Sequence, residues 1–291
     1  MIISNPSPLS NDAIEAVKKW EKTEHSRLFG FVTTGEPLSI SEINRPLVRQ
    51  VRNECKEMAK IKTLDVFLDS SGGDPDAAYQ LITFLRTKCE KMRMIVPDWA
   101  KSAATLMCLG ADEIWMTDTA ELGPLDTQIQ DPKNPQERLV SSLEQFRAMD
   151  YLKRYSFEML DTYVNLLIQR APTMRLKDMI GEATPFVTQL MAPLYGQVDP
   201  MHFGGSFRAL DLAIEYGKRL LSRYVNIDAT RINQIVDKLT WQYPSHGFVI
   251  DFEEAKSLGL NVFRLNNQQE SLADTVLENT EAWVGFLEEK K

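Results

Sequence analysis

Hydrophobic and polar positions follow two different periods along residues 28–116. Short runs of β-branched and aromatic residues alternate with longer stretches in which apolar residues recur at helical spacing. The short runs lie at 28–33, 64–68, 92–97 and 113–116, and the helical stretches lie at 41–61, 77–88 and 102–110. Apolar runs that alternate with helical patterns through short connections predict a parallel sheet with crossover helices. The sequence therefore predicts an α/β core.

The pattern changes after the turn Gly123-Pro124. Apolar residues then keep a helical period that several prolines divide into segments. Strand-like and helical patterns resume near residue 247. The expected boundaries are an N-terminal arm at 1–27, a domain at 28–265 that contains a helical block at 137–225, and a C-terminal helical tail at 266–291.

Composition narrows the classes of function. The 291 residues are 43% hydrophobic and 25% charged, as in ordinary globular proteins. With 33 basic and 41 acidic side chains the net charge is -8, which argues against a nucleic-acid binder because such a protein needs a basic face. The longest uncharged window, 183–198, contains two prolines, so we expect no stable membrane insertion. No signal segment opens the chain, and we expect a cytoplasmic protein.

Neither a cofactor nor a metal is expected. Three cysteines, Cys55, Cys89 and Cys108, are an odd count without metal-ligand spacing, which favours reduced thiols. The pair Gly72-Gly73 is followed by no Gly-Lys-Ser/Thr and lacks a third glycine. It is therefore neither a phosphate-binding P-loop nor a dinucleotide fingerprint.

Two loops carry groups that could stabilise or form a negatively charged oxygen. Gly72 and Gly73 follow the strand at 64–68, where glycines let backbone N–H groups approach a ligand closely. Taken alone, the pair is more typical of a plain βα turn. Ser102 lies at the predicted start of a helix, whose positive end favours a nucleophilic oxygen. A serine before an apolar run is more commonly an N-cap, so Ser102 alone does not establish a nucleophile.

A carboxylate and an imidazole stand in two further loops. Asp126 follows the Gly-Pro turn, although Asp is also common in turns. His246 directly precedes a strand-like run and is better placed than His25 in the N-terminal arm or His202 in the helical block. In open α/β sheets, ligands bind at the carboxyl ends of the strands. A Ser, an Asp and a His brought together there predict catalysis by an activated hydroxyl.

At these residues the sequence resembles a known family. The stretches that carry the likeness are LDVFLDSSGGDPDAA, AKSAATLMCLGADEIWM, ELGPLD and YPSHGFVIDFEEAKSLGL. They are similar to the serine dehydrogenase proteinase family, which is related to the Clp protease subunit, signal peptide peptidase A and the crotonases. The resemblance implies an α/β, Clp protease/crotonase-like core of β-β-α repeats with a large helical insertion. It implies that Ser102 is the nucleophile, Asp126 the acid and His246 the base, with Gly72, Gly73 and Ala103 at the oxyanion.

Two assignments stay open at this point. The histidine that the Clp subunit has shortly after its Gly-Pro turn is absent, because Thr127 and Gln128 stand there. Signal peptide peptidases use a Ser–Lys dyad, for which the chain offers Lys101, Lys133 and Lys153, although a lysine base needs burial. The rival acids are Asp118, Asp131 and Asp199.

Three functions compete. A serine peptidase acting on a peptide or protein ranks first, ahead of a non-catalytic scaffold or binding protein on the same fold and a crotonase-like acyl-CoA enzyme. Relatives of this fold form rings or stacked oligomers, so the resemblance also implies a homo-oligomer. The helical block, which includes Pro193, Leu194 and Tyr195, could cover the site, supply a subunit interface or simply pack as core.

Overall fold

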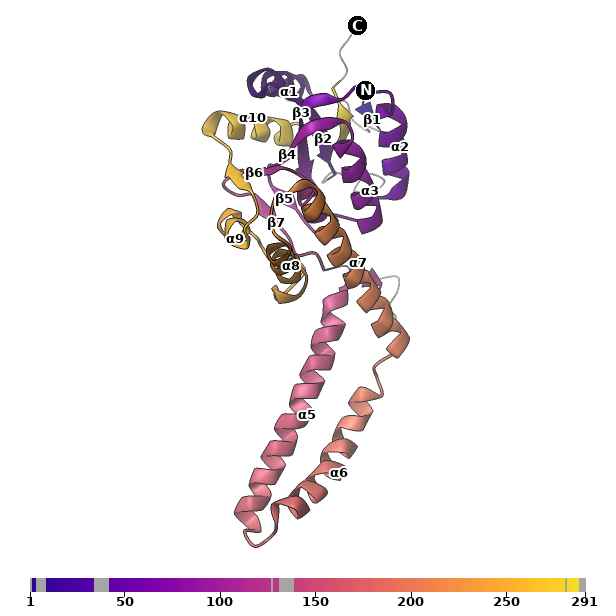
Figure 1. The fold of residues 1–291 in the computed structure, drawn as a ribbon, viewed down its shortest axis with the longest axis vertical. Coiled ribbons are helices and arrows are strands. Elements are labelled where there is room, and N and C mark those ends of the chain that lie inside the picture. Colours follow the sequence, from indigo (N-terminus) through magenta and orange to yellow (C-terminus); the bar gives the residue numbers. More distant parts are fainter. Residues whose placement is uncertain are drawn as a thin grey trace. The chain divides into compact units, whose positions relative to one another are not determined.

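A seven-stranded sheet forms the centre of the first of two units into which the chain divides. This unit comprises Met1–Asp126 and Asp211–Lys291, and the second comprises Thr127–Leu210. The computed structural model describes residues 2–3, 9–33, 42–126, 128–130, 139–280 and 282–287. Helices cover the sheet on both faces (Figure 1), so the α/β class predicted from the sequence is confirmed.

The strands run in the order β1-β11-β2-β3-β4-β6-β10. Five neighbouring strands pair in parallel, as predicted: β2 (Arg27–Val32), β3 (Ile61–Asp69), β4 (Cys89–Val96), β6 (Glu113–Met116) and β10 (Val262–Arg264). Two antiparallel strands complete one edge, β11 (Trp283–Phe286) beside β2 and β1 (Ile2–Ile3) beside β11. The sequence pattern predicts helix, and not strand, for the end of the chain. The last apolar run instead pairs with the edge of β2, which would otherwise stay unpaired.

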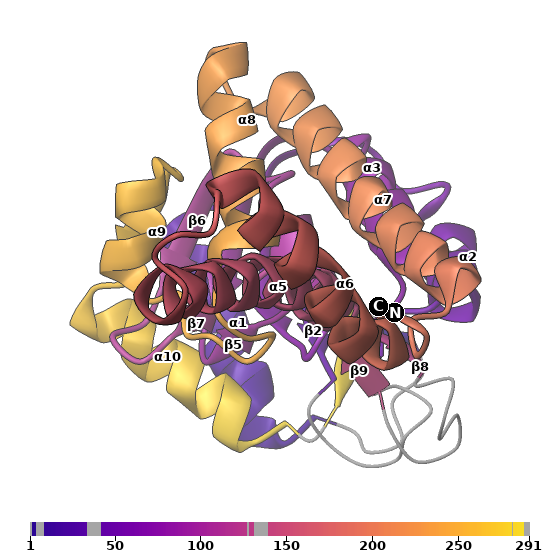
Figure 2. The ribbon, with the colours of Figure 1, turned by 90° about the horizontal axis from the view of Figure 1, so that it is seen from below.

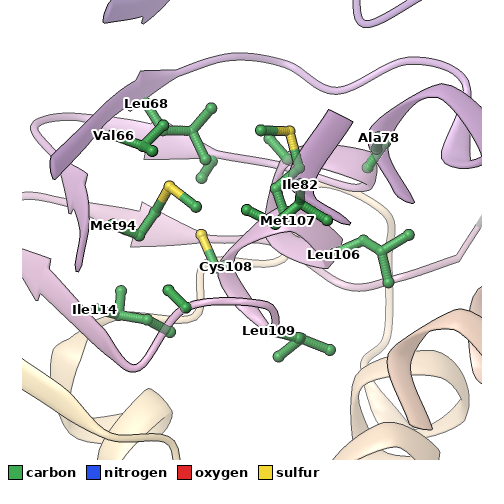
Figure 3. Close-up of a cluster of buried hydrophobic side chains, with 14 of the residues drawn as sticks. Val66, Leu68, Ala78, Ile82, Met94, Leu106, Met107, Cys108, Leu109 and Ile114 are labelled. Atoms are coloured by element: carbon green, nitrogen blue, oxygen red, sulfur yellow. The ribbon is translucent and has the colours of Figure 1, made fainter. Parts of the chain in front are cut away.

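Alternate residues of the central strands point to opposite faces of the sheet. Val66, Leu68 and Met94 pack on one face against α3 (Pro75–Arg86) and α4 (Ala103–Cys108), as Figure 3 shows. Phe67 and Ile95 point to the other face. The first face is completed by α2 (Arg45–Cys55), α8 (Ala229–Asp237) and α9 (Phe252–Leu258), and the second by α1 (Asn11–Glu24) and α10 (Asn267–Glu278). Helix α2, at Arg45–Cys55, is shorter than the helix that the pattern at 41–61 predicts.

Helix α1 packs on the sheet, whereas the polar composition of residues 1–27 predicts a surface arm. Ala13, Val17 and Trp20 form a buried stripe at helical spacing that faces the second side of the sheet. The stripe is too short to dominate the composition of its segment, which is why the sequence pattern underrates it.

A buried carboxylate fastens α1 to the sheet. Asp65 of β3 is fully buried and accepts hydrogen bonds from Trp20 Nε1 at 2.7 Å and from Ser26 Oγ at 2.6 Å. Arg93 of β4 donates to both oxygens of Asp65 at 2.6 Å and reaches Glu24 of α1 at 3.0 Å. Bidentate arginine–carboxylate pairs are among the stronger polar contacts, and here every partner is wholly or partly buried.

The second unit is helical. Helices α5 (Ser142–Arg170) and α6 (Leu176–Tyr195) lie side by side as a hairpin (Figure 1). A short antiparallel pair, β8 (Gln128–Gln130) and β9 (Leu139–Ser141), precedes them. Helix α7 (Pro200–Tyr224) ends in the first unit, beside α3 (Figure 2). There Tyr216 stacks on Tyr79 of α3, with ring centroids 4.2 Å apart. Helices thus occupy most of residues 142–224, within the block that the sequence predicts at 137–225.

Replacing Asp65 tests how much the buried network contributes. We expect Asp65→Ala to lower the free energy of unfolding by about 3–5 kcal/mol, because it leaves the guanidinium of Arg93 buried without its main partner. Urea denaturation measures the change. Glu15→Ala, which breaks the exposed pair of Glu15 with Lys18, serves as the control and should leave stability unchanged. Equal stability of the Asp65 variant and the parent would contradict this account.

Candidate active site

A row of short extended segments lies just beyond the ends of β3, β4 and β6. Ser70 pairs with Ala100, β5 (Trp99–Ala100) pairs with β7 (Glu121–Leu122), and Leu122 pairs with Ile250. The backbone hydrogen bonds that join the row are Ser70 N to Trp99 O (3.0 Å), Lys101 N to Ser70 O (3.0 Å), Gly123 N to Ala100 O (3.1 Å), Leu122 N to Ile250 O (2.9 Å) and Ile250 N to Leu122 O (3.0 Å). Four segments distant in sequence are thus held side by side.

The direction of each segment decides which loops meet. Ser70, Ala100 and Leu122 run parallel to one another, whereas Ile250 runs antiparallel to Leu122. The residues that follow the first three segments therefore leave the row at the same edge as the residues that precede Ile250. The loops at this edge are those of Gly72 and Gly73, of Ser102, of Asp126 and of His246.

Ser102 stands at the first turn of α4 in an unusual backbone conformation. Its φ is 50° and its ψ is -116°, and it occupies the N-cap position without a capping hydrogen bond from its side chain. Ser102 therefore occupies the N-cap position of α4, as the alternative interpretation predicts, but its hydroxyl does not cap the helix. Positive φ in a non-glycine residue costs about 1–3 kcal/mol and persists where the surroundings over-determine it.

Those surroundings are the buried residues of α4. Every residue of Ala103–Cys108 is buried. Thr105 Oγ1 donates to Ala100 O at 2.6 Å and accepts from Gly123 N at 3.1 Å, so one hydroxyl joins the loop of Ser102 to the Gly-Pro turn. Sequence reasoning missed Thr105, because a threonine inside an apolar helix carries no motif of its own.

The two glycines differ in what their N–H groups do. Gly72 N donates to Ser70 Oγ at 3.2 Å. Ile43 pairs with the loop, its N–H donating to Gly72 O and its carbonyl accepting from Asp74 N, both at 2.8 Å. Because alternate residues of an extended segment face opposite sides, the N–H and carbonyl of Gly73 face away from Ile43. Among the described residues, the N–H of Gly73 donates to no acceptor.

Glycine is required at both positions by close approach. Gly72 has a φ of 111° and Gly73 a φ of 140°. A Cβ on Gly72 would lie 2.8 Å from Lys101 O and 3.1 Å from Ala103 N, and a Cβ on Gly73 would overlap the backbone of Ile43. The absence of side chains therefore leaves Ala103 N, at the first position of α4, open beside Ser102. Within the described part of the chain this N–H also donates to no acceptor.

Asp126 and His246 are brought together across 120 residues of sequence. His246 Nδ1 lies 2.8 Å from Asp126 Oδ1. The Asp126 side chain is 1% exposed and that of His246 is 22% exposed. Asp118 instead pairs with Arg264 at 2.6 Å, and Asp199 caps the backbone N–H of Met201 at 2.9 Å. The third rival acid, Asp131, lies outside the described residues, as does Lys133.

The loop of His246 is fastened by a neighbouring tyrosine. Tyr243 is buried, donates its hydroxyl to Glu254 Oε1 at 2.7 Å and stacks on Phe248 at 4.7 Å. Burial, with the hydrogen bond to Glu254, raises the pKa of Tyr243 above its ordinary value. The hydrogen bond from Lys238 lowers the pKa of Glu254. Both directions keep the Tyr243–Glu254–Lys238 contacts intact near neutral pH.

Lys101 is buried and precedes Ser102 directly, but its ammonium group contacts other residues. Its Nζ lies 2.7 Å from Glu121 Oε1 and donates to Leu122 O at 3.3 Å and to Phe248 O at 3.4 Å. These three acceptors match the three donors of an ammonium group. The side chain therefore ties the loop of His246 to the segments that precede Ser102 and Asp126. Lys153 is exposed on α5 in the second unit.

In the part of the chain that the structure describes, the remaining chemistry-bearing residues form no second centre. His25 ends α1 in a left-handed conformation, and the side chain of His202 lies outside the described part. Cys55, Cys89 and Cys108 are free and buried, and burial raises the pKa of Cys89 to about 11. In the described segments, no three His, Cys, Asp or Glu side chains are grouped as metal ligands. No described helix combines the length and apolar character needed to cross a membrane.

One known protein family matches part of the chain. Residues 36–155 match the family described as ClpP-like SDH-type serine proteinase, which confirms the resemblance seen in the motifs and the Clp-like fold class. The matched segment contains Gly72, Gly73, Ser102 and Asp126, whereas His246 lies beyond it.

Two uncharacterised proteins of Methanocaldococcus jannaschii are similar in sequence. The chain is 27% identical to MJ0137 over 221 residues, which are 76% of this chain and 59% of that protein. It is 25% identical to MJ1495 over 126 residues, which are 40% of this chain and 42% of that protein. The chain therefore spans less than two thirds of the length of either relative.

Two solved structures show a distant likeness. A ClpP1 mutant from Listeria monocytogenes has a TM-score of 0.41 and 12% identity, with 87% of this chain and 98% of that chain covered. A mutant of a membrane-bound stomatin-specific protease has a TM-score of 0.29 and 11% identity, with 53% of this chain and 66% of that chain covered.

The glycine loop can be tested by adding one methyl group. We expect Gly73→Ala to lower the free energy of unfolding by at least about 1–3 kcal/mol. The φ of Gly73 suits glycine alone, and the Cβ of an alanine there would overlap the backbone of Ile43. Thermal unfolding measures the change. The matched control is Gly181→Ala in α6, where a Cβ meets nothing within 4 Å and stability should hold or rise by about 0.5–1 kcal/mol. A Gly73 variant as stable as the parent would refute the assigned conformation.

Proposed function

We propose that the protein is a serine peptidase that hydrolyses peptide bonds with Ser102 as nucleophile, His246 as base and Asp126 as the orienting acid. One observation carries the proposal: the hydrogen bond of 2.8 Å between Asp126 and His246, at the edge where the loop of Ser102 also emerges. The family match supports a serine-protease type of site.

The reaction would proceed in two halves. Ser102 Oγ attacks the scissile carbonyl carbon while His246 Nε2 takes the hydroxyl proton. The tetrahedral intermediate collapses, its C–N bond breaks, and the imidazolium returns the proton to the leaving amine. Water then repeats the attack on the acyl-enzyme with His246 again as base, which releases the acid and restores Ser102. Asp126 accepts the Nδ1–H bond throughout, so the ring keeps Nε2 available.

The N–H groups of Gly73 and Ala103 suit the developing oxyanion. Neither donates to another described residue, and the first faces away from Ile43 while the second stands at the amino end of α4. Gly72 is a poorer donor, because its N–H already bonds to Ser70 Oγ. Preorganised donors of this kind are a large source of catalysis in acyl transfer. The oxyanion assignment therefore narrows from three residues to two.

The same edge offers a place for an extended peptide. One side of the glycine loop is taken by Ile43, so a substrate would pair with the side on which the N–H and carbonyl of Gly73 lie. Main-chain pairing of this kind supplies affinity with little dependence on side chains. In the free protein Ser102 makes no hydrogen bond to His246 within the described residues. Catalytic hydrogen bonds commonly tighten when substrate binds.

The Ser–Lys dyad is the weaker alternative. A lysine base must hold a free lone pair, but the Nζ of Lys101 is surrounded by the carboxylate of Glu121 and two carbonyl oxygens. We therefore assign Lys101 a positioning role and His246 the proton transfer.

The nucleophile is tested by covalent labelling. Ser102→Ala should abolish labelling by a fluorophosphonate probe and hydrolysis of an unstructured protein such as casein, because the attacking oxygen is gone, while circular dichroism stays unchanged. Ser222→Ala, at an exposed serine on α7, is the matched control and should label like the parent. If the Ser102 variant labels as strongly as the parent, the nucleophile is another residue.

Replacing Asp126 distinguishes the Ser–Asp–His triad from the Ser–Lys dyad. Asp126→Asn should lower kcat by about 10⁴-fold, since an amide in that place favours the wrong tautomer of His246. Steady-state hydrolysis of a fluorogenic peptide gives the value. Asp118→Asn, which alters an exposed rival acid, is expected to retain the parent rate. Full activity of the Asp126 variant would speak for the lysine mechanism instead.

A further inference from the structure

Helices α2 and α3 lie side by side and run in the same direction (Figure 1). At their first residues, Arg45 Nη2 donates to Asp76 Oδ2 at 2.7 Å. At their far ends, Lys88 Nζ donates to the carbonyl oxygens of Lys56 at 2.6 Å and Met58 at 3.3 Å. Contacts at both ends therefore fix which positions of the two helices lie opposite each other.

One side of α2 carries a row of exposed basic side chains. They recur at the spacing i, i+4, i+7 and i+11, which places them on one side of a helix: Arg45, Arg49, Arg52 and Lys56. The same spacing on α3, counted from the partner of Arg45, gives Asp76, Gln80, Thr83 and Thr87. Because both helices repeat every 3.6 residues and run the same way, each later basic residue comes opposite a neutral one.

A carboxylate neutralises only the first of these basic positions, where Arg45 meets Asp76. Arg49 and Arg52 make neither an ion pair nor a side-chain hydrogen bond with any described residue. The side chain of Lys56 is 64% exposed, and its ion pair with the next residue spans 4.0 Å, so that pair is weak. The basic face, defined as Arg49, Arg52 and Lys56, is therefore free to bind an anion.

Positive charge is concentrated around the basic face. Residues 45–62 contain six basic and two acidic side chains, a net charge of +4, whereas the whole chain carries -8. All six basic side chains are exposed. A positive surface on an otherwise acidic protein attracts acidic groups to that surface in particular.

The surroundings of the basic face favour an acidic polypeptide over other anions. Helices α2 and α3 are described throughout and expose no large hydrophobic side chain, so a membrane would find no apolar anchor. The rest of the chain is strongly acidic and opposes the phosphates of a nucleic acid beyond this face. A guanidinium group binds a carboxylate through two parallel hydrogen bonds, so Arg49 and Arg52 suit Asp and Glu side chains.

The basic row begins beside the loop that the proposed chemistry uses. Ile43, two residues before Arg45, pairs with the loop of Gly72 and Gly73. From Arg45 to Lys56 the helix rises by about 16 Å. An extended polypeptide covers that length with about five residues. A substrate held at Gly73 therefore lies within a short length of chain from the basic face.

We propose that the basic face binds an acidic segment of the protein substrate, outside the residues that enter the active site. Asp or Glu side chains of that segment pair with Arg49, Arg52 and Lys56, while the scissile bond lies at Ser102. The inference rests on the proposed peptidase function and names acidic polypeptides as its substrate class. The face supplies affinity without touching the reacting atoms, so it lowers KM and leaves kcat unchanged.

Binding is measured first, in the absence of hydrolysis. In the full-length Ser102→Ala protein, fluorescence anisotropy should show that fluorescein-labelled hexaglutamate binds and that labelled hexaglutamine does not. Adding Arg49→Glu and Arg52→Glu should weaken the binding of hexaglutamate at least about tenfold, because attraction becomes repulsion. Lys19→Glu/Lys22→Glu, which changes the net charge equally at exposed positions of α1, is the matched control and should preserve the binding. Circular dichroism checks that each variant keeps its helices.

Kinetics then connects the basic face to the active site. In the parent protein, a fluorogenic peptide extended by four glutamates should have a KM at least about tenfold lower than the same peptide extended by four glutamines. Arg49→Glu/Arg52→Glu should abolish this difference and leave kcat within about twofold of the parent, because neither arginine lies in the catalytic machinery.

Three results would overturn the proposal. The first is equal binding of hexaglutamate by the Ser102→Ala protein with and without the two charge reversals. The second is tighter binding of a single-stranded oligonucleotide or of phosphatidylserine vesicles that the charge reversals abolish, which would make a nucleic acid or a membrane the occupant. The third is an equal KM for the two extended peptides while both are hydrolysed.

A failure of the proposed function gives a different result. Hexaglutamate binding that depends on Arg49 and Arg52, in a protein that hydrolyses neither peptide, would refute the chemistry proposed for Ser102. It would still support an acidic polypeptide as the occupant of the basic face.

Discussion

The candidate site depends on one row of backbone hydrogen bonds, which joins Ser70, Ala100, Leu122 and Ile250. Asp126 and His246 are separated by 120 residues, and the chain leaves the first unit and returns to it between them. Their hydrogen bond can form because Leu122 and Ile250 exchange both of their main-chain hydrogen bonds close by. Main-chain pairing does not depend on side-chain identity. The row can therefore hold its four loops in register while the loops themselves carry unusual conformations.

One of those conformations, that of Ser102, stores backbone strain where the chemistry is proposed. Ser102, Gly72 and Gly73 all have positive φ angles, and the first is not a glycine. What opposes relaxation is the buried helix α4 behind Ser102, together with the hydroxyl of Thr105 that bonds to both neighbouring segments. A strained serine that cannot cap its own helix keeps its oxygen available. Local strain is in this way offset by packing that lies outside the site.

The two units are stabilised in different ways. In the first, strand residues alternate between two apolar layers, and one buried carboxylate, Asp65, anchors α1 beneath the sheet. In the second, the hairpin buries a few side chains of α6, and no side chain of α5 from Tyr151 to Arg170 is buried. The first unit is therefore held together by buried layers on both faces of its sheet, whereas the hairpin of the second buries far fewer side chains.

Much of the fold could be predicted, because strand and helix periods are properties of neighbouring residues. The parallel strands β2, β3, β4 and β6, the helices that link them and the helical insertion all follow from such local patterns. The edge strand β11 and the packing of α1 could not, since a short apolar run shows its partner only after the sheet has formed. Likewise, the run at 247–250 looks like a strand but contributes a single bridge at Ile250.

Local patterns in the sequence are enough to predict the α/β class and the few loops on which a hydroxyl, a carboxylate and an imidazole could act. Tertiary structure alone decided that Asp126, rather than Asp118 or Asp199, reaches His246, and that Lys101 is held by Glu121. The chemical character of a side chain follows from its own residue type. The residue that it contacts depends on hydrogen bonds between segments that come together only in the folded chain.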